Sequence, residues 1–363
     1  MTLQLMLAGL ASCPGLVSSA PGLETPAFRI FQFPNDSIPR IDGDGEDWAM
    51  VGPSYQIDTG AIAADDGSGR RPDPGSLKVN VRVGWMKGLN RLYFLYEAED
   101  DYWNFEQSGL TNDIFELVVD GDRSGGPLIA RFHPELGRTL SSHDAWFGFQ
   151  NIHAQNYHIF TPAKDKDWAM AWGPQARWIK RLPWSNIAYH YDFQHGEAGK
   201  LVMEFWITPF DYASPEDPGK SVETDLTEGK TIGMAWAVID DDGPARRDFW
   251  NLSSHHTMYG EASQLCPFRL MPVEPALAEP ITAQWEFSIL DRTRRIVAFR
   301  DESAGATTWN WDFGDGETSS EQHPIHRYAT AGKFVVTLQV AGPNGRARLQ
   351  KVWDVSFVGD PPK

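Results

Sequence analysis

Apolar and polar residues alternate along several short segments of the chain, and turns rich in Gly, Pro and Asp separate these segments. Because successive side chains of a β-strand point to opposite faces, such alternation predicts strands. Many short strands joined by turns are typical of β-sandwiches and barrels. We therefore predict an all-β fold with one short helix at 208–217, and with strands at 77–85, 91–100, 113–120, 200–207 and 231–240.

The segment 273–281 separates two regions that each have their own strand pattern. It is rich in proline and small residues and lacks periodicity, which indicates a linker. We expect a large β-sandwich over 27–272 and a small immunoglobulin-like β-sandwich over 282–358, with a leader over 1–26.

The predicted strand 113–120 carries one carboxylate on an otherwise apolar face. Its positions 115, 117 and 119 are apolar and share one face, whereas Glu116 lies on the other face between Ile114 and Val118. A carboxylate without a partner is costly inside an apolar layer. We therefore expect Glu116 to have a specific partner or a ligand.

The composition favours a neutral ligand. The chain has 49 acidic and 32 basic residues and a net charge of −17, which argues against nucleic acid or an anionic membrane as a partner. Tryptophan is frequent, with 15 residues. Its broad apolar face and polar edge match the faces of sugar rings, although most single tryptophans are expected in the core.

The first residues, MTLQLMLAGLASC, form an apolar run that ends in a cysteine. This run resembles a bacterial lipoprotein signal, which implies lipidation of Cys13 and export to the cell surface. An ordinary export signal ending near Ala20 is the alternative. The chain has two cysteines, so the sequence predicts no disulfide framework.

The C-terminal region contains a run of aromatic, acidic and glycine residues, WDFGDG at 311–316, followed by His323-Pro324, Tyr328 and Gly332. In this order they resemble a PKD domain. The resemblance implies that the glycines permit a tight turn and that Asp312 and Asp315 hydrogen-bond its backbone. It also implies a spacer or interaction module without chemistry of its own, of the kind found in extracellular proteins.

Four stretches of the N-terminal region together resemble a family 9 carbohydrate-binding module. The resemblance implies a β-sandwich that binds sugars, often at chain ends, between two aromatic side chains. The stretches are PRIDG with DW at 47–48, VRVGW with LYF at 92–94, the strand 113–120, and IGM at 232–234 with FRL at 268–270.

The same resemblance names candidate binding residues. It implies that Glu116, with Arg131 on the following strand, contacts the sugar; a structural ion pair between the two is the alternative. For the aromatic walls this sequence offers two pairs of candidates, Tyr102 with Trp103 and Trp250 with Tyr259.

Two acidic loops are candidates for calcium. Asp42 and Asp44 lie in one loop, and Asp240 and Asp242 in another. Clustered carboxylate oxygens are the ligands that Ca²⁺ prefers. The resemblance also implies structural calcium, whereas the alternative is that these side chains are solvated turn residues.

The sequence predicts a binding protein rather than an enzyme. It contains no Gly-x-Ser-x-Gly elbow, no His-Glu-x-x-His and no phosphate-binding glycine loop. We expect an extracellular, non-catalytic protein that captures polysaccharide or its chain ends in support of glycan-degrading enzymes. Three alternatives remain: an adhesive surface protein, an accessory part of a glycoside hydrolase, or a DOMON-like haem-binding protein with Met234 or Met258 as a ligand.

Overall fold

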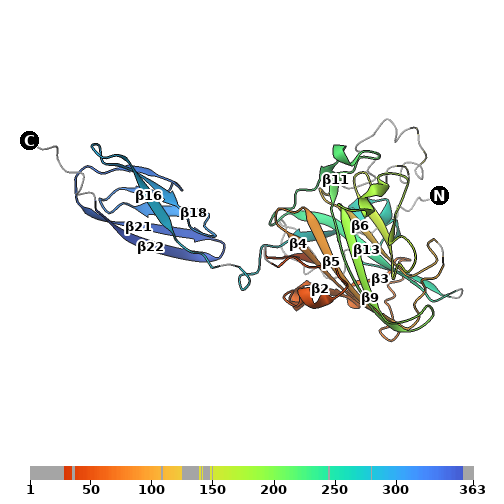
Figure 1. Ribbon diagram of the computed structural model, residues 1–363. Coiled ribbons are helices and arrows are strands. Elements are labelled where there is room, and N and C mark those ends of the chain that lie inside the picture. The colour runs from red at the N-terminus through yellow and green to blue at the C-terminus, as the bar shows by residue number, and fades with distance from the viewer. Residues whose placement is uncertain are drawn as a thin grey trace, which may run out of the picture. The chain divides into compact units, whose positions relative to one another are not determined.

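The computed structural model describes residues 28–34, 37–107, 109–124, 150–243, 246–278 and 280–354, together with 139, 141 and 148 (Figure 1). The predicted leader with Cys13, and Arg131, lie outside the described residues. The chain divides into two compact units between Val273 and Glu274, at the start of the segment predicted as a linker. Within the described part, no helix is both long and apolar enough to cross a membrane.

Most of the described part of the N-terminal unit consists of strands and short 3₁₀ turns. Its strands are β1 (Phe28–Gln32), β2 (Gln56–Asp58), β3 (Ala63–Ala64), β4 (Leu77–Met86), β5 (Arg91–Asp100), β6 (Ile114–Asp120), β7 (Gln155–Phe160), β8 (Ala169–Ala171), β9 (Ser185–Tyr191), β10 (Gly199–Ile207), β11 (Phe210–Tyr212), β12 (Val222–Glu223), β13 (Thr231–Asp241), β14 (Arg247–Asn251) and β15 (Cys266–Leu270). The 3₁₀ turns are η1 (Gly45–Trp48), η2 (Pro53–Tyr55), η3 (Thr59–Ala61), η4 (Arg177–Lys180), η5 (Pro218–Lys220), η6 (His256–Tyr259) and η7 (Ala262–Gln264).

Two large sheets form most of this unit, and strand β1 belongs to both, while β11 and β12 form a separate two-stranded sheet. One sheet has the order β8-β7-β6-β13-β15-β1, and the other has the order β1-β4-β5-β10-β9. Residues 28–30 of β1 pair with β15, and residues 31–32 pair with β4. Strand β14 pairs with the second half of β13, next to the stretch that pairs with β15. The all-β sandwich predicted for this region is confirmed.

The inner faces of the two sheets meet in one apolar core. Phe94 and Phe205 stack with ring centroids 4.5 Å apart, and Phe115 from the opposite sheet lies 6.2 Å from Phe205. Phe115, Leu117 and Val119 all belong to this core, as the alternation along 113–120 predicts. Glu116 therefore lies on the outer face of its sheet.

One predicted element is wrong. The segment 208–217 contains the strand β11 instead of a helix, and β11 pairs with β12. The side-chain amide of Gln155 accepts a hydrogen bond from the backbone N–H of Phe210 at 2.9 Å and donates one to its carbonyl at 3.0 Å. These contacts from another strand hold the segment extended, and they override the local signals for a helix.

The C-terminal unit is a smaller sandwich with its own core. One sheet has the order β16-β17-β20 and the other β19-β18-β21-β22. The core contains Trp285, Phe299 and Trp311, all at most 1% exposed. The strands are β16 (Trp285–Asp291), β17 (Ile296–Asp301), β18 (Thr308–Asp312), β19 (Thr318–Ser319), β20 (Ile325–Arg327), β21 (Lys333–Gly342) and β22 (Gly345–Asp354).

The turn after β18 explains the acidic and glycine residues of the WDFGDG run. The carboxylate of Asp312 accepts a hydrogen bond from the N–H of Gly314 at 2.9 Å, and that of Asp315 accepts one from Glu317 at 3.2 Å. Gly314 has a φ of +82°, and a Cβ there would lie 2.7 Å from the carbonyl oxygen of Val335. A glycine is therefore required at this position, and both aspartates stabilise the fold.

Candidate functional site

A row of side chains crosses the outer face of the first sheet at the level of Glu116. Glu116 of β6 is paired in register with His158 of β7 and with Ala237 of β13, and Ala237 is paired with Asn251 of β14. Side chains opposite one another in an antiparallel sheet share a face. The row thus places a carboxylate, an imidazole and an amide side by side, with only a methyl group between Glu116 and Asn251.

The small side chain of Ala237 leaves a hollow above this row. The cavity has a volume of about 230 Å³. Its lining side chains come from β6, β7, β13, β14, η6 and the turns near them: Asp65, Leu110, Glu116, His158, Trp172, Ala237, Ile239, Arg247, Phe249, Asn251, His256 and Tyr259. Trp172, Phe249 and Tyr259 are each half-buried. Their aromatic rings thus surround the polar side chains of Glu116, His158 and Asn251 at the base of the cavity.

The carboxylate of Glu116 is held by two neighbours. Its Oε1 accepts a hydrogen bond from the side chain of Asn156 at 3.0 Å and lies 3.5 Å from Nε2 of His158. Burial lowers the pKa of His158, while the charge of Glu116 acts in the opposite direction. His158 is therefore neutral at pH 7. Glu116 lines the cavity and is only 7% exposed.

The other charged groups around the cavity are paired. Nδ1 of His256 lies 2.7 Å from the carboxylate of Asp65, and Nε of Arg247 lies 3.4 Å from that of Asp241. Asp65 thus has a hydrogen-bonding partner in His256, and the guanidinium of Arg247 has a carboxylate partner in Asp241.

The structure brings together only part of the predicted binding set. Glu116 and Tyr259 both line the cavity. Trp103 and Trp250 were predicted as aromatic walls, but each is 1% exposed, so neither can offer a face to a ligand. Trp103 stacks on Phe193 at 4.8 Å, and Trp250 donates from Nε1 to Asp240.

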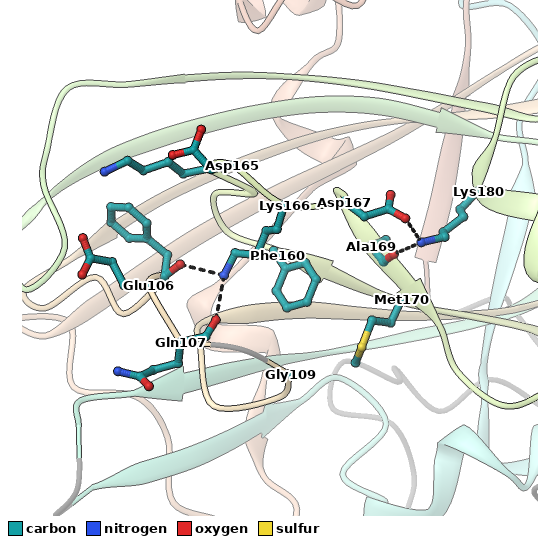
Figure 2. A pocket seen from close by; sticks show the side chains of 12 residues that line it. Glu106, Gln107, Gly109, Phe160, Asp165, Lys166, Asp167, Ala169, Met170 and Lys180 are labelled. Carbon is teal, nitrogen blue, oxygen red and sulfur yellow. Dashed lines mark hydrogen bonds and ion pairs between the residues drawn. The ribbon is translucent and has the colours of Figure 1, made fainter.

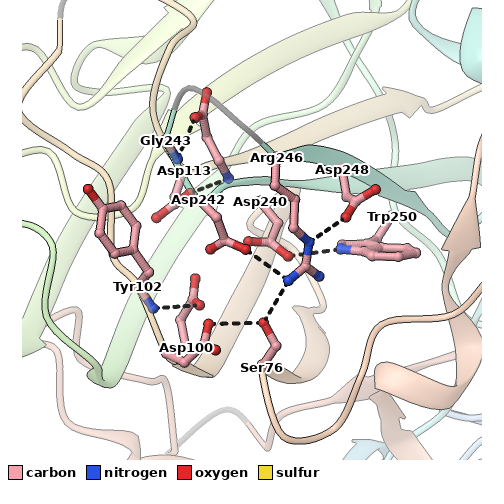
Figure 3. Close-up of polar contacts among 12 residues, drawn as sticks. Ser76, Asp100, Tyr102, Asp113, Asp240, Asp242, Gly243, Arg246, Asp248 and Trp250 are labelled. Atoms are coloured by element: carbon pink, nitrogen blue, oxygen red, sulfur yellow. Dashed lines mark hydrogen bonds and ion pairs between the residues drawn. The ribbon is translucent and has the colours of Figure 1, made fainter.

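Tyr102 does not line this cavity, although it was predicted to do so. It lies beside a separate group of carboxylates, described below (Figure 3). The lining residues that the sequence did not predict as binding residues are mainly His158, Trp172, Phe249 and Asn251. The pairing register of β7 and β14 with their neighbouring strands brings these residues to the cavity. The alternation of apolar and polar residues within one strand does not predict how that strand is paired with its neighbours.

Three aspartates converge at one end of the sandwich, between the two sheets. Asp100 is the last residue of β5, Asp240 lies in β13, and Asp242 follows β13 directly. Among the described residues they are the one group of three metal-ligating side chains whose ligand atoms all lie within 4.8 Å of one another. Figure 3 shows their carboxyl groups close together beside Arg246 and Trp250.

These three aspartates have the chemistry that a calcium ion requires. Calcium binds oxygen at about 2.3–2.6 Å, so two of its ligands can lie up to roughly 5 Å apart. The Oδ1 atoms of Asp240 and Asp242 are buried and accept no hydrogen bond from the residues that the structure describes. Buried polar atoms without a partner are rare in native proteins, and a cation is one way to satisfy them.

The predicted calcium ligands divide differently in the structure. Asp240 and Asp242 belong to the group of three, whereas Asp42 and Asp44 do not. Oδ1 of Asp42 accepts from the N–H of Asp44, and Oδ1 of Asp44 accepts from that of Glu46. Asp44 is therefore the cap of η1, and the pair serves a turn.

Burial and mutual repulsion perturb the protonation of this group. Burial raises the pKa of Asp100 to about 8, and the charge of Asp240 adds to this shift. Burial also raises the pKa of Asp240 to about 6, with a contribution from Asp242. Behind them lies Asp113, whose pKa is raised by burial and by Asp100. So much negative charge is unfavourable there without a proton or a cation.

A larger hollow on the same unit has a different character (Figure 2). It measures about 630 Å³ and is lined by three lysines, Lys164, Lys166 and Lys180. Lys166 donates to the carbonyl oxygens of Phe105 and Gln107 and to Asn112. Lys180 donates to Ala169 and pairs with Asp167. These two ammonium groups thus hold the surrounding loops together.

The two methionines named as candidate haem ligands are packed among apolar side chains. Met234 is 0% exposed in the main core, and Met258 is 1% exposed in a small cluster over the outer face of the first sheet.

Residues 278–356 match the family model of the PKD domain. Over 47 residues the chain is 40% identical to collagenase ColQ1 of Bacillus cereus (strain Q1), a match that covers 13% of this chain and 5% of that protein. The chain thus spans about a twentieth of the length of this curated relative.

Two solved structures resemble different parts of the chain. A family 9 carbohydrate-binding module from Caldicellulosiruptor kristjanssonii, in complex with cellotriose, is 13% identical with a TM-score of 0.40, over 69% of this chain and 98% of that one. The PKD1 domain of Vibrio anguillarum Epp is 27% identical with a TM-score of 0.19, over 21% of this chain and 93% of that one. By its family-model match and its WDFGDG turn, the segment 278–356 is a PKD domain.

Proposed function

We propose that the N-terminal unit is a non-catalytic carbohydrate-binding module and that the sugar lies in the cavity beside Glu116. The observation that carries the proposal is the row of Glu116, His158, Ala237 and Asn251 beneath half-buried aromatic rings. Sugars combine apolar C–H faces with a rim of hydroxyl groups. Rings can pack against those faces, and the carboxylate and the amide can bond the hydroxyls.

The size and charge of the cavity support a small neutral ligand. Pockets for drug-sized molecules measure about 300–1,000 Å³. A cavity of about 230 Å³ is smaller, which suits one sugar unit, such as the end of a chain. The arginine of the lining, Arg247, already pairs with Asp241, so the cavity offers no unpaired guanidinium to an anionic sugar. Weak affinity is expected, because an open site buries little of a polymer.

In this proposal the PKD domain is a spacer or docking surface, and the protein acts outside the cell together with glycan-degrading enzymes. The N-terminal run that ends in Cys13 supports export and a lipid anchor.

Calorimetric titration of the full chain with neutral oligosaccharides, soluble polysaccharides and uronate oligosaccharides tests the proposal. We expect a neutral sugar to bind, and Glu116→Gln to weaken binding about 10- to 100-fold, since a hydrogen bond to a charged group contributes about 1.5–3 kcal/mol. The amide oxygen of the new side chain can still accept from Asn156, so the fold should persist. We expect Tyr259→Ala to weaken binding about tenfold.

Two matched variants serve as controls. Glu99→Gln alters an exposed glutamate that pairs with Lys78 at 3.2 Å, and Tyr102→Ala removes the tyrosine that does not line the cavity. Both should bind as the wild type does. The proposal fails if no glycan binds at millimolar concentration, or if Glu116→Gln and Tyr259→Ala bind as tightly as the controls.

A further inference from the structure

We propose that the larger hollow with the three lysines continues the cavity beside Glu116, and that it binds the next units of a neutral sugar chain. This inference rests on the proposed function, because it names the kind of chain that the same face of the sheet would bind. The lysine hollow has a volume of about 630 Å³, and the cavity one of about 230 Å³. A chain whose end lies in the cavity would therefore find space for further units in the hollow.

Strand pairing places the cavity and the lysine hollow side by side on the outer face of the first sheet. His158 of β7 lines the cavity, and its register partner on β8, Met170, lines the hollow. Residues paired in register share a face, and neighbouring strands lie about 4.7–4.9 Å apart. One step from strand to strand thus leads from the cavity to the hollow.

A neighbouring row of side chains gives a second connection. Ile239 of β13 lines the cavity, Phe160 of β7 lines the hollow, and Ile114 of β6 is paired in register with both. Leu110 of the cavity and Gly109 of the hollow are consecutive in the chain. The half-buried Leu110 packs against this apolar row. Apolar side chains therefore lie between the cavity and the hollow, where the C–H face of a sugar ring can pack.

The charges around the lysine hollow balance, which favours a neutral chain. Its lining contains three lysines and three acidic residues, namely Lys164, Lys166, Lys180, Glu106, Asp165 and Asp167. Hydroxyl groups both donate and accept hydrogen bonds, so a neutral sugar can bond ammonium and carboxylate groups alike. An anionic chain would find no excess of positive charge among these residues.

Some of these side chains are already used by the protein, and others are available to a ligand. Lys166 and Lys180 donate to backbone carbonyl groups around the hollow (Figure 2). Lys164 and Glu106 are exposed, and neither forms a hydrogen bond or an ion pair with another described residue. Met170 is half-buried and offers an apolar surface. We therefore assign the contacts with hydroxyl groups to Lys164 and Glu106, and the apolar contact to Met170.

Calorimetric titration of the full chain with sugars of increasing length tests the inference. The probes are neutral chains of glucose, mannose, xylose and galactose, each from monosaccharide to hexasaccharide, beside a uronate series of the same lengths. In at least one neutral series the tetrasaccharide should bind about tenfold or more tightly than the monosaccharide, because the longer chain adds contacts in the hollow.

Variants show whether this advantage of the longer chain arises in the hollow. Lys164→Ala, Glu106→Ala and Met170→Ala should each reduce the ratio of tetrasaccharide to monosaccharide affinity about 3- to 10-fold. Glu116→Gln should instead weaken the binding of both ligands. The matched control is Lys200→Ala, which alters an exposed lysine of the other sheet and should keep the wild-type ratio.

The outcomes separate this inference from the proposed function. If no sugar of any length binds, both fail. If a neutral monosaccharide binds and depends on Glu116, but longer chains bind no more tightly, only the inference is overturned. It is also overturned if the three hollow variants keep the wild-type ratio as Lys200→Ala does, or if length increases affinity in the uronate series alone.

Discussion

Replacing Glu204 by alanine should destabilise the N-terminal unit by about 3–5 kcal/mol, since three backbone or indole donors lose a buried acceptor. Glu204 is 0% exposed on β10. Its Oε1 accepts from Nε1 of Trp48 at 2.9 Å, and its Oε2 accepts from the N–H groups of Gly43 at 2.9 Å and Asp42 at 3.3 Å. Chemical denaturation of the wild type and the variant measures this effect.

The expected loss of stability arises because Glu204 holds a loop against its sheet. Met203 and Phe205 point into the main core, so Glu204 points to the outer face of the second sheet. The loop at 42–48 covers that face with Trp48, which is 0% exposed. Gly43 has a φ of +85°, and a Cβ there would lie 2.7 Å from the backbone of Tyr189. The carboxylate thus fastens a loop that approaches the neighbouring strand too closely for any side chain at position 43.

The pH dependence of this effect has a definite sign. Burial raises the pKa of Glu204 from 4.5 to about 7, so the folded protein binds this proton more tightly than the unfolded chain does. The contribution of Glu204 to stability is therefore greatest below pH 4.5 and decreases as the pH rises through 7. Glu204→Gln, which cannot ionise, should lack this dependence. The stability difference between the wild type and Glu204→Gln should thus be larger at pH 5 than at pH 8.

A surface glutamate provides the control. Glu99 on the same sheet pairs with Lys78 at 3.2 Å, and its side chain is 55% exposed. Glu99→Ala should change stability by less than about 0.5 kcal/mol. If Glu204→Ala is as stable as Glu99→Ala, the loop at 42–48 does not depend on this carboxylate.

Strands were predictable because alternation along one strand is a local property. The strand predicted at 77–85 is β4, which ends at Met86, and that predicted at 91–100 coincides with β5. The outward direction of Glu116 follows from the same alternation. The helix at 208–217 was wrong because Gln155, distant in sequence, fixes the backbone of Phe210. Local helix propensity depends only on residues nearby in the sequence, so it cannot reflect that contact.

The site was less predictable than the fold, because side-chain burial depends on distant partners. Trp103 and Tyr259 are both aromatic residues outside the strands. Trp103 is buried by Phe193 and donates to the carbonyl of Gly199, whereas Tyr259 remains half-buried at the cavity. Likewise, Asp240 and Asp242 were recognised as acidic neighbours, but their partner Asp100 lies far away in the sequence. Contacts between residues so distant in sequence depend on how the two sheets pack together.

Replacing Trp311 by alanine should unfold the PKD domain and leave the N-terminal unit folded. Trp311 is 0% exposed, lies 5.7 Å from Trp285 and 5.5 Å from Phe299, and donates from Nε1 to the carbonyl of Glu321 at 3.0 Å. Loss of a buried tryptophan costs about 3–5 kcal/mol. Small domains have a total stability of about 5–15 kcal/mol, so this loss removes much of it.

Calorimetric melting separates the two units, because their cores consist of different residues. In Trp311→Ala, the transition of the PKD domain should disappear or shift strongly downward, while that of the N-terminal unit should stay within a few degrees of its wild-type position. Val352→Ala, at a side chain that is 69% exposed, should change neither transition. Glycan binding should be retained in both variants, since the proposed cavity is lined entirely by the N-terminal unit. A common downward shift of both transitions in Trp311→Ala would instead mean that the units unfold together, and the PKD domain would then contribute to the stability of its neighbour.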